Sequence, residues 1–210
     1  MLTARPYQRD SIDALNDALR TRDDNPCIVL PTGAGKSLVM AITLQEWFAT
    51  VPTMRVMVLA HRKELVEQNA AELEGIAPEL SVGVYAASLK RRETLKSITF
   101  ASIDSVAKRS EDFPPQDVLL IDEAHRIPVK GEGKYRKFID AMLARNPSMR
   151  VVGLTATPYR MGSGPICHRD HILNHTCYEA NVGDLIRDGY LSPIRTCEGD
   201  HATLDLSNVK

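Results

Sequence analysis

The stretch PTGAGKS at residues 31–37 places two glycines, a lysine and a hydroxyl side chain within seven positions. It follows the apolar residues 27–30 and opens a segment with helical spacing. Glycines let successive backbone N–H groups turn toward one anion, and the next helix adds its positive N-terminal end. This pattern predicts a cradle for nucleotide phosphates, in which Lys36 reaches the β- and γ-phosphates and Ser37 binds Mg²⁺.

The stretch departs from the general phosphate-loop pattern at one position. That pattern has a glycine where this chain has Leu30. A simpler interpretation therefore stays open, a strand–helix turn with a lysine nearby. On the phosphate-loop interpretation, the phosphate-binding residues are Thr32, Gly33, Ala34, Gly35, Lys36 and Ser37.

A pair of acidic residues in LLIDEAH, residues 119–125, supplies the other half of a hydrolytic site. Asp122, at the end of an apolar strand, is predicted to hold Mg²⁺ opposite Ser37. Glu123 is predicted to orient and deprotonate the attacking water. The alternative is a solvated pair that caps the next turn.

These residues need a sheet that brings them together. Apolar runs typical of strands alternate with segments of helical spacing, which predicts a mostly parallel sheet with helices on both faces. Such sheets bind ligands at the carboxyl ends of their strands. The predicted strands are 27–30, 55–60, 82–86, 97–102, 117–122 and 149–157, and the predicted helices are 7–20, 36–48, 63–76, 134–145 and a short one within 182–193.

Composition narrows the class of protein without naming a partner. The chain has 210 residues, 43% of them hydrophobic, and a net charge of −1, so any nucleic-acid binding must come from a local patch. No apolar run reaches the roughly 20 residues of a membrane helix, and the N-terminus lacks a secretory signal. We therefore expect a cytoplasmic protein whose four cysteines are reduced thiols and which binds no membrane.

Together these residues resemble the superfamily 2 helicases and translocases of DEAH-box type, over about residues 2–193. RPYQRDSI resembles the adenine-reading segment, with Gln8 as the adenine contact and Arg5 beside it. PTGAGKS resembles motif I, in which Pro-Thr-Gly replaces the earlier glycine and accounts for Leu30. LAHRKELVEQ, TFASIDSV, DEAH and LTATPYR follow in the order of motifs Ia, Ib, II and III. The resemblance implies a RecA-like P-loop NTPase fold, a three-layer αβα sandwich.

The resemblance also implies roles for residues outside the phosphate loop. His125, with the hydroxyls of Thr155 and Thr157, would link the γ-phosphate site to the nucleic-acid surface and join Lys36, Asp122 and Glu123 in catalysis. Simple capping of a strand end is the alternative for the two threonines. The nucleic-acid contacts would be His61, Arg62 and Ser102, which would touch the sugar–phosphate backbone. For His61 and Arg62 the alternative is a solvated helix start.

The sequences of the later motifs most resemble those of phage and bacterial DNA helicases related to the XPB and restriction-translocase groups. This resemblance favours DNA over RNA as the nucleic acid that the protein binds. The expected domains are a RecA-like ATP-binding domain at 1–165, its C-terminal part at 166–193 and a linker or tail at 194–210. No motif of a second RecA-like domain, with its arginine finger, is recognisable after Pro193. We therefore expect a monomeric chain that binds Mg-ATP, hydrolyses it weakly and needs that second domain as its partner.

Two other functions stay open at this point. One is a truncated nucleotide- and DNA-binding or regulatory module without turnover, and the other is an RNA helicase domain. A competing site is the segment CHRDHILNHTC at 167–177, whose thiols and imidazoles are zinc-ligand types. His171 and His175 are four positions apart and would share a face if the segment were helical. Its spacing matches no common zinc pattern.

Overall fold

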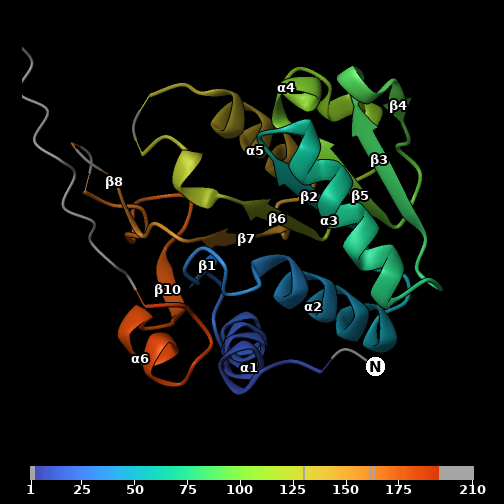
Figure 1. Ribbon diagram of the computed structural model, residues 1–210. Helices are drawn as coiled ribbons and strands as arrows, with labels where there is room; N and C mark the ends of the chain where they lie inside the picture. The colour runs from blue at the N-terminus through green and yellow to red at the C-terminus, as the bar shows by residue number, and fades with distance from the viewer. Residues whose placement is uncertain (1–2, 130, 161, 163, 194–210) are drawn as a thin grey trace, which may run out of the picture.

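The computed structural model describes residues 3–129, 131–160, 162 and 164–193. Helices and strands alternate along the chain (Figure 1). The helices are α1 Pro6–Thr21, α2 Lys36–Thr50, α3 Lys63–Ile76, α4 Ile103–Val106, α5 Lys134–Arg145 and α6 Val182–Arg187, and the 3₁₀ turns are η1 Ala87–Leu89, η2 Ser110–Asp112 and η3 Ala124–Arg126. The strands are β1 Pro26–Val29, β2 Val56–Ala60, β3 Val82–Ala86, β4 Arg91–Arg92, β5 Ile98–Ser102, β6 Val118–Asp122, β7 Arg150–Thr155, β8 Tyr159–Arg160, β9 Gly164–Pro165 and β10 His175–Glu179.

Eight of these strands form one sheet in the order β10-β1-β7-β6-β2-β5-β3-β4. All neighbouring pairs are parallel except β3 with β4. The central strands β1, β2, β5 and β6 are buried along their whole length, as expected for parallel strands covered on both faces. The predicted mostly parallel sheet is confirmed.

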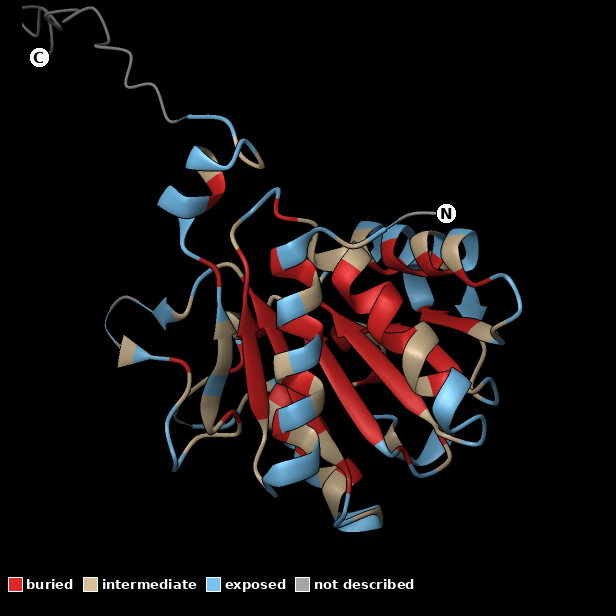
Figure 2. Ribbon diagram, turned by 90° about the horizontal axis from the view of Figure 1, so that it is seen from below, coloured by how far each residue is buried: buried red, intermediate tan, exposed pale blue. Residues whose placement is uncertain are grey.

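Alternate residues of each strand pack into two separate cores, because successive side chains point to opposite faces. In β2, Val58 packs with the core that α1, α2 and α3 cover, whereas Leu59 packs with the core that α5 covers. Figure 1 shows α5 on the opposite side of the sheet from α1 and α2, and Figure 2 shows buried strands behind helices that expose one stripe. The layers are therefore helix, sheet and helix, as the resemblance implied.

The predicted helices and the six predicted strands agree with the structure to within a few residues. The segment 167–177 differs: a turn precedes Leu173, and His175 begins the edge strand β10, which pairs in parallel with β1. The expectation that His171 and His175 share a helix face is therefore wrong. The polar stretch after residue 87 also contains the short strand β4.

Among the described residues, no helix has both the length and the apolar character needed to span a bilayer. The predicted linker or tail at 194–210 and Cys197 lie outside the described residues. Cys27, Cys167 and Cys177 are free thiols in the structure, and the expected reduced state stays a prediction.

Candidate nucleotide site and nucleic-acid face

The carboxyl ends of β1, β7 and β6 lie side by side and bring three sequence motifs to one edge of the sheet. Val29 is level with Thr155, and Asp122 is level with Leu154. The N–H of Leu30 donates to the carbonyl of Thr155 at 2.9 Å, which ties the start of the phosphate loop to the end of β7. The sheet therefore places the loop, the acidic pair and Thr155 around one space, as predicted.

The phosphate loop has the backbone conformation of an anion cradle. Gly33 and Gly35 have φ values of +83° and +78°, in the left-handed region that favours glycine. Gly35 is the N-cap of α2 and supplies no side-chain acceptor, so the first N–H groups of α2 remain available to a ligand. The Nζ of Lys36 lies 3.4 Å from the carbonyl of Leu30 and so folds over the loop.

Gln8 holds the loop from α1 and is almost fully buried, at 2% exposure. Its Nε2 donates to the carbonyl of Ala34 at 2.9 Å, and its Oε1 accepts the N–H of Arg5 at 2.9 Å. The hydroxyl of Tyr7 donates to the same Ala34 carbonyl at 2.9 Å. The structure thus gives Gln8 a role that sequence reasoning missed, which is to support the loop, and its predicted adenine contact stays a prediction.

An aromatic cluster lies beside this end of the loop. The ring centroids of Tyr7 and Tyr190 are 5.1 Å apart, and the guanidinium of Arg5 lies 5.2 Å from the Tyr190 ring centroid. A Cβ at Gly33 would lie 3.4 Å from Leu191, so the segment after α6 packs against the loop. Tyr190 was not predicted as a site residue, because only the fold brings this distant segment to the loop.

The two acidic residues turn toward different partners, as a split in their roles requires. Asp122 is 8% exposed, and its Oδ2 accepts a hydrogen bond of 3.1 Å from the Nδ2 of Asn69. Burial raises the pKa of Asp122, and the Asn69 hydrogen bond opposes that rise. Glu123 has a φ of +53°, rare for a non-glycine residue, and its carboxylate lies 3.2 Å from the Nδ1 of His125.

A short polar chain leads from Glu123 to β7. The Nδ1 of His125 lies 3.0 Å from the Oγ1 of Thr155, which also accepts the N–H of Thr157 at 3.0 Å. Burial lowers the pKa of His125, and Glu123 opposes this. The predicted link through His125 and Thr155 has the required geometry, whereas Thr157 joins it through its backbone.

Helix α3 adds two polar residues that sequence reasoning missed. Asn69 donates a hydrogen bond to Asp122, and Glu72, one turn later, lies near Ser37. Burial raises the pKa of Glu72, and the nearby Ser37 side chain opposes the rise. Asn69 and Glu72 are three positions apart on a helix whose buried face includes Val66 and Leu73. This spacing was the sequence signal that could have placed both polar side chains on one face of α3. Ser37 and Asp122 offer a hydroxyl and a carboxylate, the oxygen donors that suit Mg²⁺.

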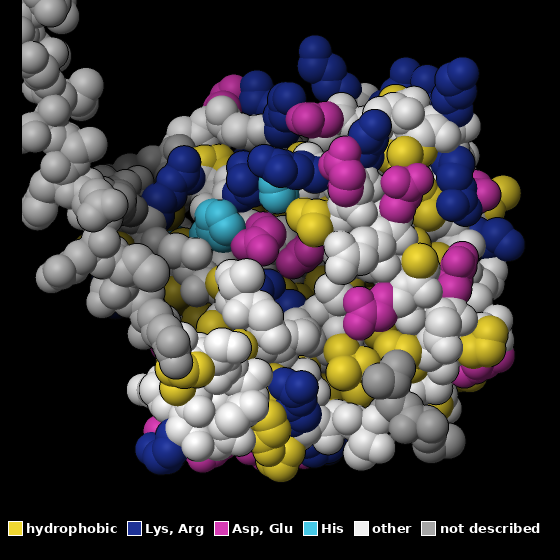
Figure 3. Space-filling model, in the orientation of Figure 1, with side chains coloured by type: hydrophobic (Ala, Val, Ile, Leu, Met, Phe, Trp, Pro, Cys, Tyr) yellow, Lys and Arg dark blue, Asp and Glu magenta, His cyan; other side chains and the backbone are white. Residues whose placement is uncertain are grey.

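The predicted nucleic-acid residues lie at the ends of β2 and β5, further along the same edge. His61 and Arg62 follow β2, and Ser102 ends β5, which neighbours β2. The Oγ of Ser102 is 2.8 Å from the Oγ of Ser105, so this hydroxyl already has a partner. Burial, with Arg126 and Arg62, lowers the pKa of His61. Figure 3 shows Lys and Arg side chains gathered over the upper part of this face.

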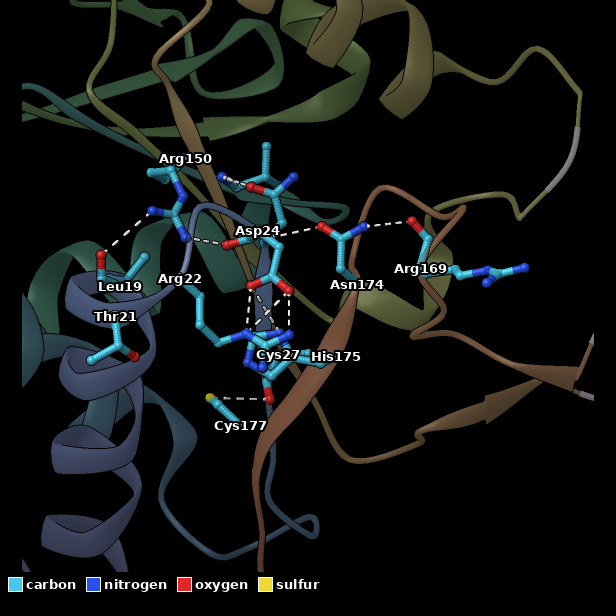
Figure 4. Close-up of polar contacts among 12 residues, drawn as sticks. Leu19, Thr21, Arg22, Asp24, Cys27, Arg150, Arg169, Asn174, His175 and Cys177 are labelled. Carbon is cyan, nitrogen blue, oxygen red and sulfur yellow. Dashed lines mark hydrogen bonds and ion pairs between the residues drawn. The ribbon is translucent and has the colours of Figure 1, made fainter.

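Side chains of the Cys/His segment contact different partners near the amino end of β1 (Figure 4). His175 lies 3.2 Å from Asp24, which also pairs with Arg22. The Sγ of Cys177 lies 3.4 Å from the carbonyl of Cys27. Within the described ranges, no group of three or more His, Cys, Asp or Glu side chains could hold a metal ion.

The fold and the site define a RecA-like domain of the superfamily 2 helicase type, as the resemblance implied. Residues 1–160 match the ResIII family, described as the type III restriction enzyme, res subunit. The chain belongs to this family.

Known proteins similar to the chain are much longer. One is IRC3, a proposed ATP-dependent helicase of Saccharomyces cerevisiae, 26% identical over 219 residues that cover 98% of this chain and 30% of that protein. Another is the XPB helicase/translocase subunit of transcription and DNA repair factor IIH of Schizosaccharomyces pombe, 26% identical over 92% of this chain and 24% of that protein. The chain thus spans less than a third of either relative.

A solved structure supports the fold. It is a nuclease-deletion mutant of the Type ISP restriction-modification enzyme LlaGI in complex with a DNA substrate mimic. The superposition has a TM-score of 0.67 and 14% sequence identity, over 90% of this chain and 21% of that one.

Proposed function

We propose that this chain is the ATP-binding motor domain of a DNA helicase or translocase. One observation carries the proposal: an uncapped phosphate loop, the buried Asp122 and a Glu123–His125–Thr155 chain meet at one sheet edge. A strand–helix turn without a ligand would require none of these neighbours. On this proposal residues 1–165 and 166–193 act as one motor domain, and residues 194–210 lead out of it.

The loop residues 32–37 would hold the phosphates through backbone N–H groups and the ammonium of Lys36. Binding requires Lys36 to leave the Leu30 carbonyl, which is a weak contact at 3.4 Å. Ser37 and Asp122 would hold Mg²⁺, with Asn69 of α3 fixing the Asp122 carboxylate and Glu72 of α3 lying near Ser37. When bound, the metal would neutralise negative charge that develops on the transferred phosphoryl group.

Glu123 is the proposed base that takes a proton from the attacking water. Its contact with His125 positions the carboxylate and joins it to Thr155. A change at the γ-phosphate would therefore reach β7 and the adjacent nucleic-acid face through a contiguous set of contacts. Lys36, Asp122, Glu123 and His125 form the catalytic set in this proposal.

DNA is the proposed nucleic acid, because the LlaGI complex contains a DNA substrate mimic and the XPB relative belongs to a DNA repair factor. His61, Arg62 and Ser102 would contact its backbone. We also propose that a second RecA-like domain completes the ATP site and supplies an arginine finger, a group typically worth about 10³–10⁵ in rate. Turnover by this chain alone should therefore be slow.

The test compares the wild-type chain with Glu123→Gln in two assays, binding of a fluorescent ATP analogue with Mg²⁺ and hydrolysis of ATP with and without DNA. We expect Glu123→Gln to bind nucleotide as the wild type does and to lose the slow hydrolysis. Equal hydrolysis by the two proteins would contradict the role of Glu123. Robust DNA-stimulated hydrolysis by the wild-type chain would contradict the need for a second domain.

A further inference from the structure

A cavity of about 360 Å³ lies among the end of β2, the start of α4, the turn η3 and the start of α5. His61 and Ile103 line it, so it borders the residues that follow β2 and β5. Arg126 lines it too and directly follows His125. The cavity therefore lies between the proposed nucleic-acid face and the acidic motif. Several of the residues that line it belong to neither set.

Two arginines in this cavity form no ion pair with any residue that the structure describes. Arg126 and Arg160 both line it and both are exposed. In the part of the chain that the structure describes, neither guanidinium forms an ion pair or a side-chain hydrogen bond. The cavity also contains Lys134 and Asp104, whose charged atoms pair with each other at 2.7 Å. The positive charge of the two arginines is therefore left for a ligand.

The cavity wall also includes the uncapped start of a helix. Helix α5 has 12 residues, and its N-cap, Gly133, supplies no side-chain acceptor. A Cβ at Gly133 would lie 2.6 Å from Pro128, so the packing at this position favours glycine and excludes a capping side chain. The first N–H groups of α5 and its positive end thus face the same region as the arginines.

Buried polar atoms without partners give an independent reason to expect a ligand here. Tyr135 lines the cavity and is 6% exposed, yet its hydroxyl has no hydrogen-bond partner among the described residues. The Nδ1 of His61, also in the cavity wall, has none either. An unsatisfied buried polar group is unfavourable. Neither atom is open to solvent as it stands, so a ligand with several acceptor oxygens would relieve this cost once the side chain turns toward the cavity.

We propose that this cavity binds one backbone phosphate of the nucleic-acid strand, through Arg126, Arg160 and the start of α5. A phosphate matches the set of donors, because arginine binds phosphate oxygens bidentately and helix N-termini favour anions. The proposal rests on the proposed function and deepens it by naming a phosphate contact outside motifs Ia and Ib. Because Arg126 adjoins His125, the strand would hold the acidic motif directly.

The test uses the whole chain and a fluorescein-labelled single-stranded DNA oligonucleotide, with anisotropy measured from about 50 to 200 mM salt. We expect Arg126→Gln and Arg160→Gln each to weaken binding about tenfold and to lower the slope of log affinity against log salt by about one. Tyr135→Phe should weaken binding with the slope unchanged, because it removes a donor and no charge. Arg187→Gln, on the exposed surface of α6, is the matched control and should bind as wild type.

Wild-type affinity and slope in both arginine variants would overturn this inference and leave the proposed nucleic-acid binding in place. A wild-type chain that binds no oligonucleotide would overturn both together. Inorganic phosphate at constant ionic strength separates the two sources of a phosphate group. If it displaces the oligonucleotide from wild type but not from Arg126→Gln, phosphate and the strand compete for the cavity, as proposed. If phosphate binds wild type and not Arg126→Gln yet leaves the oligonucleotide bound, the cavity takes free phosphate, and its assignment to a strand is wrong.

Discussion

Gly35 offers a sharp test of how α1 supports the phosphate loop. In Gly35→Ala, the new Cβ would lie 2.5 Å from the Nε2 of Gln8, at a φ of +78°. Gly33→Ala is the matched control, because its φ is +83° but its Cβ would meet only Leu191, at an ordinary 3.4 Å. Both variants therefore carry left-handed strain, and only one displaces Gln8.

The strain of a left-handed alanine costs about 1–2 kcal/mol. Displacing Gln8 breaks its 2.9 Å bond to the Ala34 carbonyl, and loss of a buried partner adds about 1–3 kcal/mol. We therefore expect Gly33→Ala to lower the free energy of unfolding by about 1–2 kcal/mol and Gly35→Ala by about 2–5 kcal/mol.

Urea denaturation followed by circular dichroism measures both values. Adding Gln8→Ala to each variant completes a double-mutant cycle. The cycle should show coupling between positions 8 and 35 and little between positions 8 and 33. Equal destabilisation by the two alanines, without coupling to Gln8, would refute the reasoning.

Two further predictions concern side chains that position others. Asn69→Leu removes the hydrogen bond to Asp122 and should weaken Mg-ATP binding several-fold, whereas Gln68→Leu on the exposed face of the same helix should not. Titration of both variants with ATP in Mg²⁺ and in EDTA checks this, and an equal loss in EDTA would contradict a metal-linked role. Arg22, followed by His175, holds the pKa of Asp24 below its usual value (Figure 4). A depressed pKa stabilises the fold above the unfolded pKa of about 3.9, and that stability is lost as pH falls through the lower folded value. Asp24→Asn should therefore be less stable than wild type at neutral pH, with the difference shrinking below about pH 4. Urea denaturation of both proteins at neutral pH and below about pH 4 tests this. The same difference in the free energy of unfolding under both conditions would contradict it.

Local sequence patterns were enough to predict most of the sheet and the motif positions. The strands β1, β2 and β6 are short apolar runs, and Asp122 stands where one of them ends. By contrast, β10 has the mixed composition HTCYE and only partial burial. Its register depends on pairing Pro26 with His175, 149 positions apart, and no local pattern reports such a pairing.

The same limit applies to the site. Gln8 is predicted to contact adenine, and the structure adds a second role, because its amide donates to the carbonyl of Ala34, 26 positions away. Asn69 is an ordinary polar residue of a helix until the fold places it against Asp122, 53 positions away. Thr157 joins the polar chain through its N–H, a choice that residue type cannot reveal.

The measurement that tests the account most directly is a calorimetric titration of the chain and of Lys36→Ala with ATP in the presence of Mg²⁺. Lys36 is the proposed ligand of the β- and γ-phosphates, and among the described residues its ammonium forms one hydrogen bond, to the Leu30 carbonyl at 3.4 Å. We predict that wild type binds ATP, that Lys36→Ala shows no measurable binding and that the two share one circular dichroism spectrum. Unchanged ATP affinity in a folded Lys36→Ala would contradict the phosphate-loop assignment.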